Sequence, residues 1–206
     1  PSIEVQRTEE AEAIKLFSNV YRDLHFSIGN LFSEICLEHG LDENIVIDAA
    51  NLDYDRNNIP KPGFVGGPCL TKDAIILSST LVDPDLRDAI YAGRAANKRR
   101  IKKLLNKYKS NIFNSKNLLV SGLAFKGKPA TDDVRDSPAL DILSSLKKYL
   151  SPDTNVYLHD FEISLKEMKK ISEEFGYSIR RKDIAHDTLI ILNNHDRYRD
   201  EKEKFN

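Results

Sequence analysis

The strongest constraint on the fold of this chain is a long helical pattern near its start. From about Thr8 to His39, apolar side chains recur in steps of three and four residues, and Gly40 ends the pattern. A helix of about 30 residues is about 45 Å long, which is longer than a small domain needs. Such helices usually bridge domains or pair with a second copy, so the sequence predicts a homodimer through this helix. Cys36, on the apolar stripe, is expected in the core.

Two more helices are expected in the first half of the chain. One covers about Asp42 to Asn51. The other begins at Asp83-Pro84, where a capping residue precedes a proline, and ends near Lys109. The last turns of this third helix are densely basic. A solvated face is the favoured interpretation, with nucleic-acid binding as the alternative, because regular aromatic interleaving is missing.

The second half of the chain has a different pattern. After the expected linker SNIFNSKN, the segments LLVSGLAF, NVYLHDF and DTLIILNN are typical of buried strands, and SPALDILSSLKKYL and SLKEMKKISEEFG of helices. Strands that alternate with helices predict a parallel sheet with right-handed crossovers. The sequence therefore predicts two domains, a helical one at residues 1–112 and an α/β one at residues 113–206.

Composition narrows the functional classes. The chain has 206 residues, a net charge of −1 and 31% charged residues, so it has no overall bias toward nucleic acid or anionic membranes. No apolar run approaches the ~20 residues that cross a bilayer, and no signal peptide is visible. Two cysteines allow no disulfide framework, so a cytoplasmic location is the default expectation. The chain begins at Pro1 without a methionine, and we interpret it as a fragment.

The segment with the most chemical content is PKPGFVGGPCLTKDAIIL, from Pro60 to Leu77. Its glycines bend the backbone, and a helical spacing follows, so Cys69 is expected at or just before a helix N-terminus. The free N–H groups of a helix start and the nearby Lys72 favour a thiolate. Asp73 follows four residues later and shares a helix face with Cys69. The sequence thus predicts a nucleophile beside a carboxylate, while a buried and inert thiol is the alternative.

Two further groups of polar residues are candidates for binding anions. Lys15 and Asn19 are spaced i, i+4 on the first helix, which would aim a cation and an amide at one oxyanion, although two solvated side chains are the alternative. Arg56 lies in a polar loop and either binds an anion or is merely exposed.

The first strand of the second half ends in the loop AFKGKPATDDVRDSP. Ligands of parallel sheets bind at the carboxyl ends of the strands, and an aromatic residue with several cations beside a helix start suits a phosphate. The loop contains neither a G-x-G-x-x-G turn nor a P-loop. The five histidines show no metal-binding spacing, so no metal site is expected.

Three stretches of this chain carry a resemblance to a known family: AEAIKLFSNVYRDL, GFVGGPCLTKDA and VSGLAFKGKPATDDVRDSPALDIL. In this order the chain resembles the UDP-glucose/GDP-mannose dehydrogenase family of NAD-dependent nucleotide-sugar 6-dehydrogenases. The resemblance implies an all-α central domain followed by an α/β Rossmann-like domain with a parallel sheet. It also implies that the N-terminal domain, which binds most of the NAD, is absent from these 206 residues.

The resemblance implies a reaction and catalytic residues. Members of the family oxidise the sugar C6 alcohol twice, with two NAD⁺, to a carboxylate. Cys69 matches the nucleophile that forms a thiohemiacetal and then a thioester. Lys15 and Asn19 match the pair that stabilises the oxyanions, and Asp73 matches the carboxylate that positions water.

The resemblance also implies binding residues. Those for the nucleotide-sugar are Phe64, Val65, Gly66, Gly67, Phe125, Lys126 and Arg56, and those for the cofactor are Arg135 and Lys72. The chain departs from the family pattern at two places. The loop before Arg135 is two residues longer, and Pro68 stands where members acting on N-acetylated sugars often have histidine.

The substrate class follows from the same resemblance. It implies a UDP-sugar such as UDP-glucose or UDP-N-acetylmannosamine, with GDP as the less common base. The alternative from another functional class is a non-catalytic helical dimerisation module joined to an α/β domain that binds a nucleotide ligand.

Overall fold

The computed structural model describes residues 2–200. They fall into two compact units, one up to Arg100 and the other from Ile101 onward. The first unit is helical and the second is an α/β unit with a parallel sheet, which confirms the predicted fold class. The units divide within one helix, between Arg100 and Ile101. The domain boundary expected at residue 112 stays a prediction.

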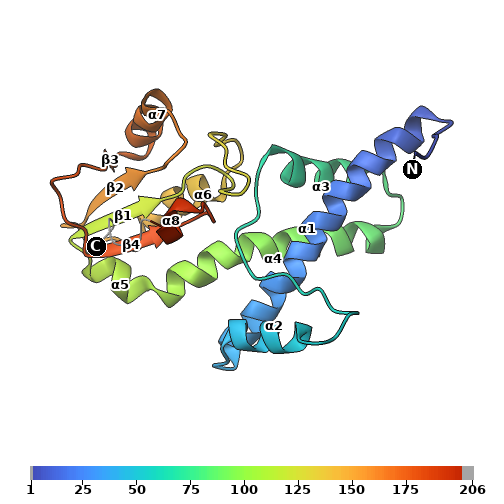
Figure 1. Cartoon of the computed structure of the whole chain (residues 1–206), viewed down its shortest axis with the longest axis horizontal. Helices are drawn as coiled ribbons and strands as arrows, with labels where there is room; N and C mark the ends of the chain where they lie inside the picture. The colour runs from blue at the N-terminus through green and yellow to red at the C-terminus, as the bar shows by residue number, and fades with distance from the viewer. Residues whose placement is uncertain (1, 201–206) are drawn as a thin grey trace. The chain divides into compact units, whose positions relative to one another are not determined.

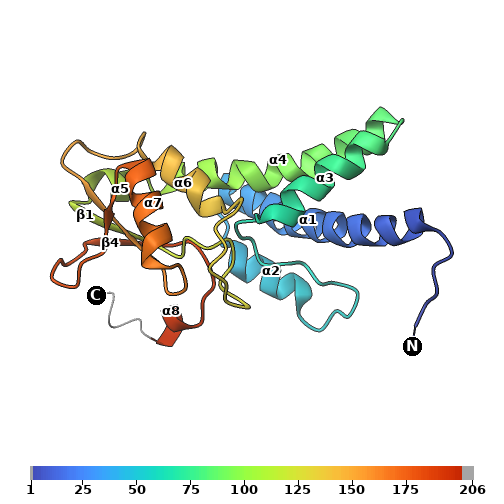
Figure 2. The same cartoon turned by 90° about the horizontal axis from the view of Figure 1, so that it is seen from above.

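The helical unit is organised around α1. Its helices are α1 (Thr8–Glu38), α2 (Glu43–Asn51), α3 (Pro68–Thr80) and the larger part of α4 (Pro84–Lys107). Both α2 and α3 pack against α1 (Figure 1, Figure 2). The carboxylate of Glu10 accepts a hydrogen bond from the Arg7 N–H at the start of α1, and Asp42 caps α2 through two backbone N–H groups.

The face that α1 buries within this unit is polar. The side chains of Asn19, Asp23 and Asn30 are each at most 4% exposed, and Cys36 is buried as expected. The apolar stripe lies on the surface of the chain. Its exposed members are Ile14, Phe17, Tyr21, Ile28, Leu31 and Ile35. A continuous exposed apolar stripe is uncommon on a surface that remains in water.

Two kinds of contact hold the helical unit together. Val20, Ala74 and Ile90 form a small apolar cluster that joins α1, α3 and α4. Below it, Arg94 of α4 forms a buried ion pair with Asp23 of α1. Burial raises the pKa of the Asp23 carboxyl, and the charge and hydrogen bond of Arg94 oppose that rise.

The α/β unit contains a four-stranded parallel sheet in the order β3-β2-β1-β4. The strands are β1 (Asn117–Ser121), β2 (Asn155–His159), β3 (Ser178–Ile179) and β4 (Thr188–Ile191). The helices are α5 (Lys109–Asn114), α6 (Pro138–Leu146), α7 (Leu165–Phe175) and α8 (Arg197–Asp200). Ser137 caps α6 ahead of Pro138, and Gly176 ends α7 in the left-handed conformation.

The core of this unit lies on β1, whose residues Leu118, Leu119 and Val120 are fully buried. A central strand of a parallel sheet is covered on both faces, and this explains its continuous apolar sequence. Because β2 and β4 pair with opposite sides of β1, the strand order reverses there. The carboxyl ends of β1 and β4 therefore mark the topological switch point, where ligands of such sheets bind.

Two local expectations were wrong or incomplete. The segment expected as a linker contains most of the helix α5, and β3 is a strand that was not anticipated. Within residues 2–200, no helix combines the length and apolar content needed to span a membrane. The same residues contain no group of three His, Cys, Asp or Glu side chains placed to hold a metal ion.

Candidate functional site

Cys69 lies in the first turn of α3 and is exposed. Gly67 is the N-cap residue at φ 92°, a backbone conformation that favours glycine, and Pro68 occupies the first helical position. The hydroxyl of Thr71 donates to the Gly67 carbonyl oxygen at 3.0 Å. The sequence expectation that Cys69 stands at a helix N-terminus is confirmed. This position exposes the thiol to the free N–H groups of the helix start.

Asn19 and Asp73 meet in the buried contact between α1 and α3. The Asn19 Nδ2 donates to Asp73 Oδ2 at 2.6 Å, and both side chains are at most 5% exposed. Asp73 follows Cys69 by one helical turn. The structure therefore brings together two of the predicted catalytic residues, a carboxylate and an amide, and the carboxylate lies one helical turn after the thiol of Cys69.

The remaining polar candidates of this unit are exposed. Lys15 lies one turn before Asn19 on α1, and its i, i+4 spacing places both on one side of the helix. The Nζ of Lys72 lies 4.0 Å from Asp73 Oδ1. Arg56 lies in the loop between α2 and α3, where its side chain is exposed. The structure gives Arg56 no contact with Cys69, so its role stays a prediction.

Residues Ile59 to Gly67, here called the strap, lead into α3 without helix or strand. Phe64, Val65 and Gly66 lie in this strap and are partly buried. Backbone groups of an irregular segment need partners from elsewhere, and side chains of α1 and α2 supply them here.

In the α/β unit, the loop after β1 carries the predicted binding residues Phe125 and Lys126. Both side chains are partly buried, and the Lys126 Nζ lies 5.3 Å from the centre of the Phe125 ring. The Phe125 N–H donates to the Asp133 carbonyl oxygen at 3.0 Å, which closes the loop on itself.

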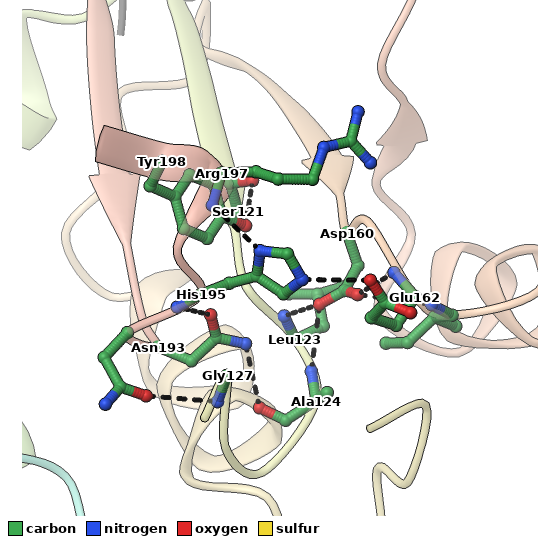
Figure 3. A network of polar contacts seen from close by, with 12 residues as sticks. Ser121, Leu123, Ala124, Gly127, Asp160, Glu162, Asn193, His195, Arg197 and Tyr198 are labelled. Carbon is green, nitrogen blue, oxygen red and sulfur yellow. Dashed lines mark hydrogen bonds and ion pairs between the residues drawn. The ribbon is translucent and has the colours of Figure 1, made fainter. Parts of the chain in front are cut away.

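Side chains from the other strand ends fix this loop on both sides (Figure 3). Asp160, after β2, accepts hydrogen bonds from the N–H groups of Leu123 and Ala124 at 2.7 and 3.1 Å. The Nδ2 of Asn193, after β4, donates to the Ala124 carbonyl oxygen at 3.3 Å. These contacts fix the loop backbone at the carboxyl edge of the sheet, the edge at which ligands of parallel sheets bind.

Gly127 allows the loops after β1 and β4 to pack without a gap. A Cβ on Gly127 would lie 2.1 Å from the backbone nitrogen of His195, closer than any side chain allows. The Gly127 N–H donates to the Oδ1 of Asn194 at 3.2 Å, and His195 Nε2 forms a 2.9 Å contact with Glu162. The glycine is therefore required for a close backbone approach at the switch point.

A cluster of polar and aromatic side chains lies at the carboxyl end of β1. The Ser121 hydroxyl hydrogen-bonds with the Tyr198 hydroxyl at 2.7 Å and with His159 Nδ1 at 2.8 Å. Burial raises the pKa of the Tyr198 hydroxyl well above its usual range, so Tyr198 is protonated at neutral pH. The Arg197 guanidinium lies 4.1 Å from the centre of the Phe161 ring. These contacts join the ends of β1 and β2 to α8.

Arg135, predicted to bind the cofactor, is exposed and forms a bidentate contact with Asp133 in the same loop, at 3.0 and 2.7 Å. These hydrogen bonds hold the pKa of the Asp133 carboxyl below its usual range. A bound phosphate would have to compete with this carboxylate, so the cofactor role stays a prediction.

Sequence reasoning missed Asp160, Asn193 and His195. Their signal was positional, because each lies within a few residues of the end of a predicted strand.

Comparison with protein families now gives the wider context. A model described as "UDP-glucose/GDP-mannose dehydrogenase family, central domain" matches residues 9–99, and the "UDP binding domain" model of that family matches residues 119–205. The chain belongs to the UDP-glucose/GDP-mannose dehydrogenase family. The resemblance carried by the three sequence stretches is thereby confirmed.

Relatives within the family are nucleotide-sugar dehydrogenases. The UDP-N-acetyl-D-mannosamine dehydrogenase of Methanocaldococcus jannaschii is 30% identical over 200 residues, which cover 92% of this chain and 41% of that protein. That of Salmonella typhi is 28% identical and covers 95% of this chain and 47% of that protein.

The solved structures that resemble this chain are also those of nucleotide-sugar dehydrogenases. The UDP-N-acetyl-mannosamine dehydrogenase Cap5O from S. aureus aligns with a TM-score of 0.75 at 28% identity, over 98% of this chain and 46% of that chain. A UDP-glucose dehydrogenase from Pyrobaculum islandicum aligns with a TM-score of 0.70 at 26% identity, over 94% of this chain and 45% of that chain. The chain therefore spans less than half the length of the relatives it matches.

Proposed function

We propose that this chain forms part of an NAD-dependent nucleotide-sugar 6-dehydrogenase. The observation that carries the proposal is the buried Asn19–Asp73 hydrogen bond, one helical turn from the exposed Cys69. A nucleophile at a helix start, with a carboxylate and an amide one helical turn away, matches the needs of acyl chemistry at a single carbon. Family membership supports the same reaction.

The chain's own residues then have distinct roles. The thiolate of Cys69 adds to the C6 aldehyde and forms a thiohemiacetal, and oxidation of that carbon gives a thioester. Lys15 and Asn19 donate hydrogen bonds to the oxyanions of these steps. Asp73 positions the water that hydrolyses the thioester to the carboxylate and releases the Cys69 thiol.

The proposed cofactor is NAD⁺, which when bound accepts one electron pair in each of the two oxidations. The sequence contains no G-x-G-x-x-G turn, and the residues that fit the cofactor are cations, Lys72 and Arg135, each suited to a phosphate group. We therefore propose that NAD is bound mainly by a domain outside these 206 residues.

The proposed substrate is a UDP-sugar. The strap residues Phe64 to Gly67 are proposed to contact the sugar and pyrophosphate through their backbone, while Phe125 and Lys126 contact the nucleotide portion. Arg56 is a further proposed contact. UDP-N-acetylmannosamine is the first candidate because several relatives carry that activity in their names, and UDP-glucose is the second.

We also propose that the protein is a homodimer through α1. The six exposed members of the apolar stripe repeat along the helix at intervals that keep them on one side. A second copy of the same stripe is self-complementary and would cover it along its length.

The decisive experiment replaces Cys69 with serine in the full-length protein and measures uronate formation from UDP-N-acetylmannosamine and UDP-glucose. We expect Cys69→Ser to abolish four-electron oxidation, because serine is a far poorer nucleophile at neutral pH. The matched control is Cys36→Ala, which removes the buried thiol of α1. Unchanged uronate formation by Cys69→Ser would remove Cys69 from the mechanism.

A second measurement separates the enzyme from a non-catalytic dimerisation and binding module. An activated Cys69 should react with iodoacetamide below pH 8, and a UDP-sugar should protect it. Slow alkylation of Cys69 at the rate of Cys36, with no turnover of any nucleotide-sugar, would favour the non-catalytic module.

A further inference from the structure

The strap depends on side chains from α1 and α2 for its backbone partners. Asn51 pairs with both backbone groups of Ile59: its Nδ2 donates to the carbonyl oxygen and its Oδ1 accepts from the N–H, each at 2.9 Å. Four residues later, the Gly63 N–H donates to the Oδ1 of Asn30 at 2.9 Å. The strap is thus fixed at two points before it reaches Cys69.

Gly29 lets the strap lie directly on α1. A Cβ at this position would lie 2.3 Å from the carbonyl oxygen of Pro60, and backbone atoms cannot yield as a flexible side chain would. Gly29 and Asn30 are adjacent, so one turn of α1 receives the strap through a close approach and a hydrogen bond.

The amide of Asn30 has only one workable orientation. Asn30 is fully buried, and its Nδ2 donates to Asn97 Oδ1 at 2.8 Å. The Asn97 Nδ2 donates in turn to Asp23, at 3.0 Å to the carboxylate and 3.2 Å to the carbonyl oxygen. The carboxylate of Asp23 also pairs with Arg94 and acts as an acceptor for both groups.

Each acceptor therefore fixes the orientation of the next amide group. Because Asp23 takes the NH₂ group of Asn97, Asn97 presents its oxygen to Asn30. Asn30 must then present its own oxygen to the Gly63 N–H. A reversed Asn30 amide would place two donors face to face at Gly63 and two acceptors at Asn97. The chain of contacts runs through the buried interior and ends on the strap.

We propose that Asn30, oriented by Asn97 and Asp23, is a positioning residue for the strap and for Cys69. It holds Gly63 in place, six residues before the thiol, so that the strap backbone and the start of α3 keep one geometry while substrate reacts. The inference rests on the proposed function, because the strap is there the part that contacts the sugar. Small displacements of reacting groups lower rates strongly.

The test compares Asn30→Ala with Ser27→Ala in the full-length protein. Ser27 is a matched control, because it is also buried on α1 and its hydroxyl donates to the Leu24 carbonyl oxygen of its own helix at 2.7 Å. We expect Asn30→Ala to lower kcat/KM for UDP-N-acetylmannosamine by roughly 10- to 100-fold relative to the control. We expect the KM for the nucleotide-sugar to rise and the KM for NAD to stay unchanged. A partly unfolded variant would instead lower kcat and leave both KM values unaltered.

A second variant, Gly29→Ala, tests the same proposal if Asn30→Ala does not fold. Gly29→Ala removes no hydrogen-bonding group and displaces the strap by steric contact with Pro60. It should give the same pattern of KM and kcat/KM. Amide hydrogen exchange of the strap should be faster in both variants than in Ser27→Ala.

Two results would overturn the proposal. One is a kcat/KM of Asn30→Ala and Gly29→Ala equal to that of Ser27→Ala, and the other is unchanged hydrogen exchange in the strap. If the wild-type protein oxidises no nucleotide-sugar, the proposed function fails by itself. Amide hydrogen exchange of the strap and the rate of Cys69 alkylation by iodoacetamide then still decide whether Asn30 positions the thiol. A change of both rates in Asn30→Ala supports the proposal, and no change in either rate rejects it.

Discussion

At the scale of single residues, the Asn19–Asp73 pair has the most defined chemistry. Asp73→Ala would leave the buried Asn19 amide without its partner, which costs about 1–3 kcal/mol of stability. Because Asp73 is the group proposed to position water, its loss should also lower turnover by about 10²- to 10⁴-fold. Urea unfolding and steady-state kinetics of the full-length protein measure the two effects, with Asp55→Asn in an exposed loop as the control.

The isosteric variant Asp73→Asn separates the two effects. It keeps the shape and one amide oxygen for Asn19, so stability should recover in part while turnover stays low. Turnover of Asp73→Asn at the wild-type level would contradict a role for the carboxylate.

The sequence predicted the spacing within each helix but not the contact between helices. An i, i+4 spacing shows that Lys15 and Asn19 share one face, and likewise Cys69 and Asp73. Nothing in either pattern specifies that Asn19 meets Asp73, because the apolar stripe of α1 indicated a different face as the buried one. Asn30 was missed for the same reason, since a polar residue on a buried polar face carries no periodic signal.

At the scale of elements, the exposed stripe of α1 has a measurable consequence. The double variant Phe17→Glu/Tyr21→Glu should convert the proposed dimer into a monomer, because each copy would bury two unpaired charges in the apolar contact. Both residues are exposed in the single chain, so its folding is expected to survive. Sedimentation velocity of the full-length protein measures the change, with the neighbouring, exposed Arg22→Glu off the stripe as the control. An unchanged mass for the double variant would exclude the stripe as the dimer contact.

At the start of the sheet, a carboxylate should make the stability of the α/β unit depend on pH. Asp187, before β4, accepts hydrogen bonds from the Ser115 hydroxyl and from the N–H groups of Lys116 and Asn117. Burial raises the pKa of this carboxyl, but the hydrogen bonds outweigh burial and hold it below the ordinary value of 3.8. Because the folded-state pKa is lowered, this stabilisation is present above pH 3.8 and is lost as the pH falls through the folded-state value.

Asp187→Asn should therefore destabilise the α/β unit by about 1–2 kcal/mol at neutral pH. The difference from wild type should shrink as the pH falls below 3.8, where the wild-type carboxyl becomes protonated as well. Urea unfolding at several pH values measures this, with the exposed Asp153→Asn as the control. A difference that stays constant with pH would show that charge is irrelevant at this site.

The elements that the sequence predicted well are the long and strongly patterned ones. Short continuous apolar runs and helical patterns located β1, β2, β4, α6 and α7. The two-residue β3 is too short to show any period, and its pairing with β2 comes from the sheet around it. The six-residue α5 contains serine and asparagine, which favour turns, so its helical state was not visible in the sequence.

At the scale of the whole molecule, the chain consists of two units that each have their own core. The sequence distinguished them because the first half shows only helical patterns, whereas short apolar strands alternate with helices in the second half. A ligand that binds one unit alone should stabilise that unit alone, by about 2.7 kcal/mol at a concentration 100 times its Kd.

UDP is the ligand that tests this separation, because a UDP binding domain model matches residues 119–205. In the full-length protein, we expect UDP to slow amide hydrogen exchange in the loops after β1 and β4, which Asp160 and Asn193 hold at the sheet edge. Lys126→Ala should remove the effect by deleting the proposed phosphate contact, whereas the matched control Lys128→Ala, an exposed lysine paired with Asp196, should retain it. Protection of the strap alone would place the nucleotide on the helical unit and contradict the assignment of Phe125 and Lys126.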